Sequence, residues 1–156
     1  IVSIGMLEHV GRPNFPMYME DASDMLKDGG LFLLHYISDP SEKETSAWIR
    51  KYIFPGGCLP SLREMVSLAY DYDMNVIDVE SLRYHYYKTL MHWYNNFQGV
   101  REQVEAKRGS EFVRMWDLYL CACASTFQNG IIDLHQLLFT NVRQVSTSVI
   151  WTCIKF

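Results

Sequence analysis

The chain has 156 residues, of which 49% are hydrophobic and 21% charged, and its formal net charge is −4. This composition is typical of one soluble globular domain with a substantial core, and the acidic balance disfavours a nucleic-acid partner, which needs a basic surface. The longest apolar runs, such as GLFLLHYI at 30–37, are too short to span a membrane. The chain shows no signal peptide and does not begin with Met, so we expect it to be a piece of a longer protein.

The first third of the chain alternates strand and helix patterns. Residues 1–5, IVSIG, form a short apolar strand pattern that ends just before Glu8. A helical segment at 14–28 follows and is closed by two glycines, which suit a helix end. Residues 31–38 are then almost continuously apolar, as in a strand covered on both faces. Two strand-to-helix steps in succession favour an α/β fold with a parallel, helix-covered sheet.

The second half of the chain continues the alternation after a stretch rich in proline and glycine. Ser61, followed three residues later by Glu64, is a capping-box pattern and predicts a helix that begins at residue 62. The residues from 141 onwards are β-branched and aromatic where a solvated tail is usual, and they form an atypical tail. The predicted elements are a helix at 62–73, a strand at 74–80, helices at 86–106 and 111–127, and a strand at 131–140.

Neither the cysteines nor the histidines have the spacing of a metal site. Cys121 and Cys123 are one residue apart in a helical pattern, which directs their thiols to different faces, and no second pair completes a tetrahedral set. The histidines show no H-E-x-x-H arrangement. We therefore expect no metal, and free thiols in a reducing cytosol. The residues concerned are Cys58, Cys121, Cys123 and Cys153, and His9, His35, His85, His92 and His135.

Three polar residues at the ends or inside of predicted elements could be functional or merely structural. Glu8 follows the first strand, and the carboxyl end of a strand in an open α/β sheet is where ligand-facing groups are expected. A loop acid facing water is the simpler alternative. His35, within a buried strand, could be a core histidine, and Tyr86 begins an apolar stripe at helical spacing that is more often a core face.

Five blocks of the sequence, taken in order, closely resemble the carboxyl-terminal portion of a known enzyme family. The blocks are SIGMLEHVG, LKDGGLFLLHYI, KYIFPGGCLPS, HYYKTLMHWY and CACASTFQNGIIDLHQLLF. They are similar to cyclopropane fatty acid synthases, mycolic acid cyclopropane synthases and related S-adenosylmethionine-dependent fatty-acid methyltransferases. Five ordered blocks are far more specific than any one of them. The resemblance covers about residues 1–140, and the tail at 141–156 does not match.

The resemblance implies the carboxyl-terminal part of a Rossmann-like methyltransferase domain at 1–140, with a mixed sheet and helices on both faces. The family's sheet has seven strands, of which this chain would hold the last four. The first two should be parallel neighbours, and the last should run antiparallel between the second and third. The amino-terminal, glycine-rich part that holds most of the S-adenosylmethionine would lie outside the chain, leaving Gly5 and Met6 as candidate cofactor contacts.

The resemblance also implies a set of catalytic residues. In the family a bicarbonate ion lies beside the reacting methyl group, and the matching motifs assign its binding to the side chains of Glu8, His35 and Tyr86 and the backbone amide of Ile37. A fifth contact, a cysteine backbone, lies upstream. Methyl transfer to an isolated cis double bond leaves a carbocation, and ring closure then needs a base in an apolar pocket. Glu8 and His35 should therefore lie at the same edge of the sheet.

The implied function is S-adenosylmethionine-dependent methylene or methyl transfer to the cis double bond of unsaturated fatty acyl chains of phospholipids, as in cyclopropane-fatty-acyl-phospholipid synthases. Such an enzyme would be cytoplasmic and peripheral at the membrane, and this fragment would be inactive alone. The apolar edge at 1–5 favours aggregation or a homodimer. Two alternatives remain: a small-molecule N-methyltransferase, since plant alkaloid enzymes share the Glu-His stretch, and a non-catalytic lipid-binding fragment.

Overall fold

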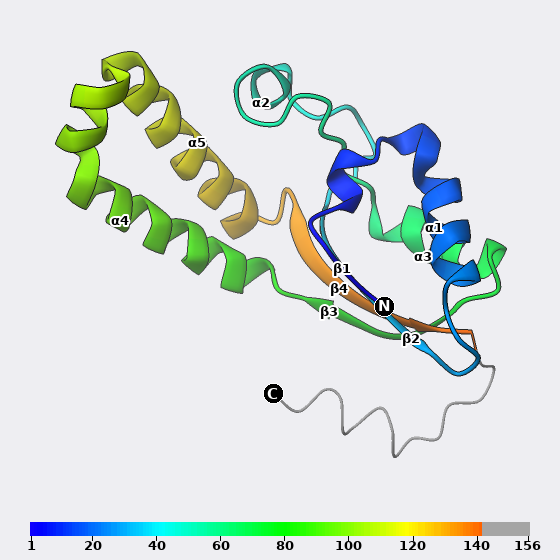
Figure 1. The fold of residues 1–156 in the computed structure, drawn as a ribbon. Coiled ribbons are helices and arrows are strands. Elements are labelled where there is room, and N and C mark those ends of the chain that lie inside the picture. The colour runs from blue at the N-terminus through cyan, green and yellow to red at the C-terminus, as the bar shows by residue number, and fades with distance from the viewer. Residues whose placement is uncertain (142–156) are drawn as a thin grey trace.

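A mixed four-stranded sheet organises the computed structural model, which describes residues 1–141 (Figure 1). The strand order is β1-β2-β4-β3. β1 (Val2–Ile4) is parallel to β2 (Leu31–Ser38), and β4 (Asp133–Thr140) is antiparallel to both β2 and β3 (Asn75–Ser81). The predicted topology is therefore confirmed, including the last strand between the second and the third.

One face of the sheet carries most of the core. Along β2 the side chains of Phe32, Leu34 and Tyr36 are fully buried, whereas the alternate side chains are only partly buried. The buried face is covered by α1 (Phe15–Asp24) and α3 (Leu62–Asp71). β2 is predicted to be covered on both faces; its second face is partly buried and packs at Ile37 against helices from later in the chain.

The capping box predicted at the start of α3 is present. The Ser61 hydroxyl accepts a hydrogen bond from the backbone amide of Glu64 at 3.0 Å, and the Glu64 carboxylate accepts one from the amide of Ser61 at 2.7 Å. Arg12 also contacts Glu64 at 2.7 Å and donates to the carbonyl of Leu59 at 3.1 Å. These bonds tie α3 to the two segments that precede it.

Two long helices form a hairpin that projects from one end of the sheet (Figure 1). α4 (Arg83–Arg108) and α5 (Ser110–Gln128) extend slightly beyond their predicted limits and meet at Gly109, whose φ of 85° favours glycine. Their apolar faces pack together and reach the sheet at Ile37 and Leu134. The stripe beginning at Tyr86 thus does contribute to a core face. No described helix is both long and apolar enough to cross a bilayer.

The segment between β2 and α3 contains a short helix, α2 (Ala47–Tyr52), that the sequence patterns did not predict. The segment is fixed at its ends, because the amide of Asp39 donates to the carbonyl of Pro60 at 3.1 Å. Two 3₁₀ helices, η1 (Leu7–His9) and η2 (Arg12–Asn14), connect β1 to α1. Apart from its first residue, the predicted tail at 141–156 lies outside the described residues.

Candidate functional site

The turn after β1 places Glu8 beside the carboxyl end of β2. Gly5 has a φ of 63°, a conformation that favours glycine, and its amide donates to the carbonyl of His35 at 2.9 Å. Leu7 is fully buried in the core and anchors η1. The chain therefore turns sharply onto the sheet edge, and Glu8, the middle residue of η1, is only 8% exposed.

The Glu8 carboxylate is held firmly by one of its two oxygens. Oε1 accepts a hydrogen bond from the amide of Ile37 at 2.8 Å, and the backbone carbonyl of Glu8 accepts one from the amide of Cys58, also at 2.8 Å. Oε2 is buried and has no hydrogen-bond partner among the described residues. Buried polar atoms are nearly always partnered, because an unpaired one loses its hydration without compensation. Oε2 is therefore suited to a polar ligand.

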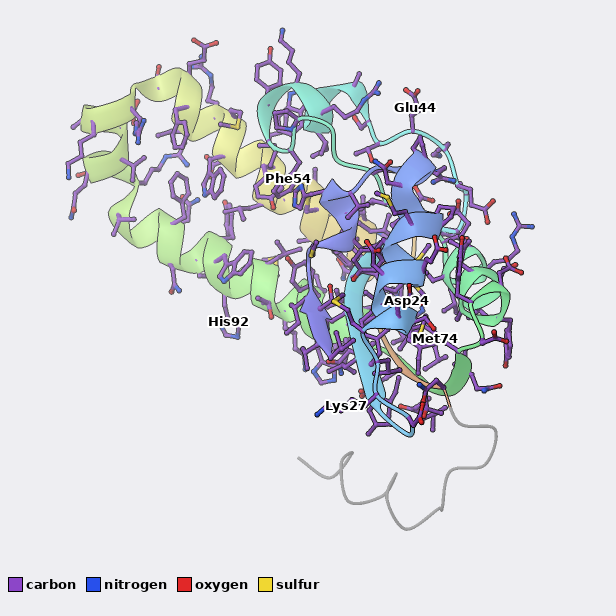
Figure 2. The ribbon with its side chains drawn as sticks, turned by 45° about the vertical axis from the view of Figure 1, so that its right-hand side comes forward. Asp24, Lys27, Glu44, Phe54, Met74 and His92 are labelled. Atoms are coloured by element: carbon purple, nitrogen blue, oxygen red, sulfur yellow. The ribbon has the colours of Figure 1, made fainter. Side chains whose placement is uncertain are left out.

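Glu8 borders a cavity of about 270 Å³ that is otherwise mostly apolar. η1, the segment around α2, and the two helices of the hairpin all contribute to its wall. Figure 2 labels Phe54, which lies between α5 and the turn containing η1. The aromatic lining residues are Phe54, Tyr86, Tyr119 and Phe127, the aliphatic ones include Ile37, Ile49, Leu59, Leu90 and Ile132, and the polar ones include Glu8, His9 and Thr45.

Aromatic rings in the cavity wall contact one another edge to face. The ring centroids of Tyr86 and Phe127 are 4.8 Å apart, and those of Phe54 and Tyr119 are 6.1 Å apart. Burial raises the pKa of the Tyr86 phenol, and the negative charge of Glu8 contributes to the shift. Tyr86 therefore stays protonated and can donate a hydrogen bond. The electron-rich ring faces are suited to a positively charged reacting group.

The structure brings some of the sequence-predicted residues together and leaves others outside. Glu8, Ile37, Tyr86 and Gly5 line the cavity, whereas His35 and Met6 are not among the lining residues. His35 lies at the register of Ile4 on one side and Gln136 on the other, and Met6 is 58% exposed. Glu8 and His35 lie at the same end of the sheet, because Glu8 bonds the residue two positions beyond His35.

The resemblance assigns the Ile37 amide to the ion, but in this structure that amide donates to Glu8. A backbone amide has a single hydrogen, and Oε1 of Glu8 accepts it. The Ile37 amide therefore fixes the position of the Glu8 carboxylate and does not contact a ligand itself. Glu8 Oε2, which has no partner within residues 1–141, and the donating phenol of Tyr86 can both meet a ligand directly.

Several lining residues were missed by reasoning from the sequence. Phe54, Cys123 and Phe127 fall within the blocks that carry the family resemblance, and membership of these blocks is the sequence signal that marks them. Thr45 and Tyr119 lie outside the blocks, and no sequence signal marks them.

The described cysteines are free thiols. Cys58 and Cys123 are half-buried and Cys121 is exposed, while Cys153 lies outside the described residues. Burial raises the pKa of the Cys123 thiol to about 11, so this lining residue is protonated near neutral pH. Within residues 1–141 no group of three or more histidine, cysteine or acidic residues is placed to hold a metal ion.

The mixed sheet, with β1 parallel to β2, an antiparallel β4 inserted between β2 and β3, and helices packed on it, is the α/β arrangement of a Rossmann-like fold. Comparison with known protein families narrows this class. The family model "Mycolic acid cyclopropane synthetase" matches residues 1–137. The chain belongs to this family.

Individual relatives agree with this assignment. The chain is 38% identical over 144 residues to a "Probable fatty acid methyltransferase" of Pseudomonas putida, covering 88% of the chain and 36% of the relative. It is 38% identical over 141 residues to a "Cyclopropane-fatty-acyl-phospholipid synthase" of Escherichia coli, covering 90% and 37%. The chain thus spans about a third of the length of these curated relatives.

Solved structures show the same likeness in three dimensions. The crystal structure of the mycolic acid cyclopropane synthase CmaA1 in complex with SAH and CTAB superposes with a TM-score of 0.81 at 33% identity. The match covers 89% of this chain and 54% of that protein. The described fold therefore corresponds to about half of a known enzyme structure.

Proposed function

We propose that this chain forms the acyl-binding part of an S-adenosylmethionine-dependent enzyme that transfers a methylene or methyl group to the cis double bond of unsaturated fatty acyl chains of phospholipids. Bicarbonate is the proposed base. The observation that carries the proposal is the buried Glu8 carboxylate, whose Oε2 lacks a partner among the described residues in a largely apolar, aromatic cavity. An apolar pocket with a single carboxylate in its wall suits an acyl chain that reacts at one double bond.

Glu8 and Tyr86 have distinct roles in the proposed site. Glu8 Oε2 accepts a hydrogen bond from the hydroxyl of the bound ion. The Ile37 amide holds the other carboxylate oxygen in place at 2.8 Å. The Tyr86 phenol, whose pKa is raised, remains a hydrogen-bond donor and orients the ion's negative oxygen. Bicarbonate fits these residues because it can both donate one hydrogen bond and accept another. When bound, it would supply the base that removes a proton from the cationic acyl chain.

The aromatic wall has a second proposed role. Phe54, Tyr119 and Phe127 surround the cavity together with Tyr86. Their ring faces stabilise positive charge that develops on the acyl chain, and they exclude water, which would otherwise add to the cation. His35 does not line the cavity but faces the same side of β2 as Ile37, and its proposed contact with the ion requires the site to extend along this face.

S-adenosylmethionine would supply the methyl group, and most of its binding residues are proposed to lie in the family's amino-terminal portion. Gly5, at the cavity edge, is the contact that this chain would offer from its own turn. Met6 does not line the cavity, so its position favours a cofactor contact less than that of Gly5 does. The proposed phospholipid substrate lies in a bilayer, so we propose a cytoplasmic enzyme that binds the membrane surface peripherally.

The test uses the full-length protein, S-adenosylmethionine and vesicles of unsaturated phospholipid. Mass spectrometry of the acyl chains should show the gain of one methylene unit at the double bond, and fragmentation then distinguishes a ring from a methyl branch. Saturated phospholipid is the matched substrate control and should remain unmodified. Turnover should increase with added bicarbonate in carbonate-depleted buffer.

Two results would overturn the proposal. Methylation of small amines with no modification of unsaturated lipid would identify an N-methyltransferase instead. Binding of lipid vesicles without any transfer, by a full-length protein that binds S-adenosylmethionine, would identify a non-catalytic lipid-binding protein.

A further inference from the structure

A second unpartnered polar atom lies in the wall of the same cavity. Thr45 lines the cavity from the segment that precedes α2, and its Oγ1 is buried without a hydrogen-bond partner among residues 1–141. Glu8 lines the cavity from η1, so the two orphaned atoms come from different parts of the chain. Only three buried side-chain atoms of the described residues lack a partner, and two of them belong to residues of this one cavity.

The position of Thr45 in the chain makes its unused hydroxyl informative. A threonine next to the start of a helix usually bonds the nearby backbone, as a cap or in a local turn. Thr45 stands immediately before Ser46, the N-cap of α2, and neither hydroxyl makes a side-chain capping bond. Ser46 is exposed and can bond water, whereas the Thr45 hydroxyl is enclosed. Burying a hydroxyl without a partner opposes folding unless a ligand satisfies it.

We propose that the Thr45 hydroxyl is a further contact for the small oxyanion held by Glu8, and that it positions this ion within the cavity. The inference rests on the proposed function. A hydroxyl suits this task because it can donate to an anionic oxygen and rotate to accept from a protonated one. Thr45 therefore contacts the ion from the segment before α2, whereas the fixed carboxylate of Glu8 contacts it from η1.

The location of Thr45 links ion binding to the α2 segment. Ile49 and Phe54 line the cavity from the same segment, and the segment is joined to η1 by the bond from the Cys58 amide to the Glu8 carbonyl. An ion bonded to both Glu8 and Thr45 would hold α2 against η1 from a second point. Bound ion should therefore also tighten the acyl-binding wall formed by the same segment.

The test compares Thr45→Val, which keeps the shape but removes the hydroxyl, with Thr45→Ser, which keeps the hydroxyl. Ser46→Ala is the matched control, because it removes an exposed neighbouring hydroxyl that does not line the cavity. In full-length protein, sodium bicarbonate is titrated and its binding followed by the ¹³C NMR signal of labelled bicarbonate, without turnover. The bicarbonate dependence of turnover is measured in parallel.

Thr45→Val should weaken bicarbonate binding roughly tenfold, the effect of losing one hydrogen bond to a charged group, and raise the half-saturating bicarbonate for turnover by a similar factor. Thr45→Ser should restore binding to within about threefold of the parent, and Ser46→Ala should match the parent. Thermal unfolding of Thr45→Val without bicarbonate should not occur at a lower temperature, because an apolar group replaces an unsatisfied hydroxyl. A purely structural hydroxyl would change stability and leave bicarbonate affinity alone.

Unchanged bicarbonate affinity in Thr45→Val, when Glu8→Gln does weaken it, would overturn this inference and leave the proposed function intact. If bicarbonate binds neither the parent protein nor any variant, the proposed base is wrong and the role of Thr45 fails with it. An equal loss of affinity in Thr45→Val and Thr45→Ser would also overturn the inference, since the hydroxyl would then not be the group that matters.

Discussion

Glu8→Gln is the substitution that most directly tests the site. Glutamine has nearly the same shape as glutamate, and its side-chain carbonyl can still accept the 2.8 Å bond from the Ile37 amide. The backbone bond from Cys58 is unaffected. The change is therefore confined to the second oxygen, which becomes an NH₂ group that donates where the carboxylate accepted. The geometry of the cavity should survive while its one negative charge is lost.

The expected loss of activity follows from this single contact. A charge-assisted hydrogen bond that acts in the transition state of a dry site contributes about 2–4 kcal/mol, so turnover should fall about 30-fold to about 900-fold. S-adenosylmethionine binding should change little, because Glu8 is proposed to hold the ion and not the cofactor. The free energy of unfolding should change by about 1 kcal/mol or less, since no uncompensated charge is left buried.

The assay measures turnover on unsaturated phospholipid, S-adenosylmethionine affinity and thermal unfolding of the same full-length preparations. Added bicarbonate should rescue part of the loss if the variant still binds the ion weakly, because a higher concentration restores occupancy. A Glu8→Gln protein that folds normally, binds the cofactor normally and turns over at the parent rate would refute the proposed role. A large drop in unfolding temperature would instead show that the carboxylate is mainly structural.

Three further predictions concern Tyr86, the α3 cap and the sheet edge. Tyr86→Phe should lower turnover while S-adenosylmethionine affinity stays near the parent value. Because the pKa of Tyr86 is raised, a pH–rate profile of the parent enzyme should show no loss of turnover from ionisation of the Tyr86 phenol below about pH 10. Ser61→Ala removes the cap bond that the hydroxyl accepts from the Glu64 amide and the 2.7 Å bond that it donates to Glu42, and should cost about 1–2 kcal/mol of stability in denaturant unfolding, with Ser61→Thr as the conservative control. The isolated 156-residue chain should aggregate or dimerise through β1, an edge strand whose Ile4 is 66% exposed. In analytical ultracentrifugation, Ile4→Lys should reduce this association, whereas the control Val100→Lys on α4 should not. A monomeric parent chain would contradict the predicted association through β1.

The fold was predictable where local chemistry and tertiary packing agree. The capping box of Ser61 and Glu64 is a property of four consecutive residues, so the sequence shows it directly. The strand order is different, because no periodicity indicates that the last strand lies between the second and third. That arrangement was predicted only through the family resemblance. The short helix α2 escaped prediction, since its six residues lie between turns and carry no clear apolar period.

The site was predictable only in part, and the reason is geometric. Glu8 and Tyr86 belong to recognisable blocks, and the structure places both in one cavity. The orphaned hydroxyl of Thr45 has no signature in the sequence, because its significance comes from what is missing around it among the described residues. His35 shows the converse case. Its block is recognisable, and because His35 lies two residues before Ile37 it faces the same side of β2 as that lining residue. The cavity reaches Ile37 but not His35, so the position along the strand, and not the face, keeps His35 out of the lining.

The bonds around Glu8 explain why an acid should follow the first strand. Its side chain is tied to β2 through the Ile37 amide, and its carbonyl is tied to the α2 segment through the Cys58 amide. One residue thus joins the sheet to the cavity wall while leaving one carboxylate oxygen for a ligand. Because the anchoring bonds use Oε1 and the backbone, the remaining oxygen is fixed without being consumed, as a preorganised contact must be. A surface loop acid would need none of these bonds, so their combination favours a binding role for Glu8 over a solvent-facing one.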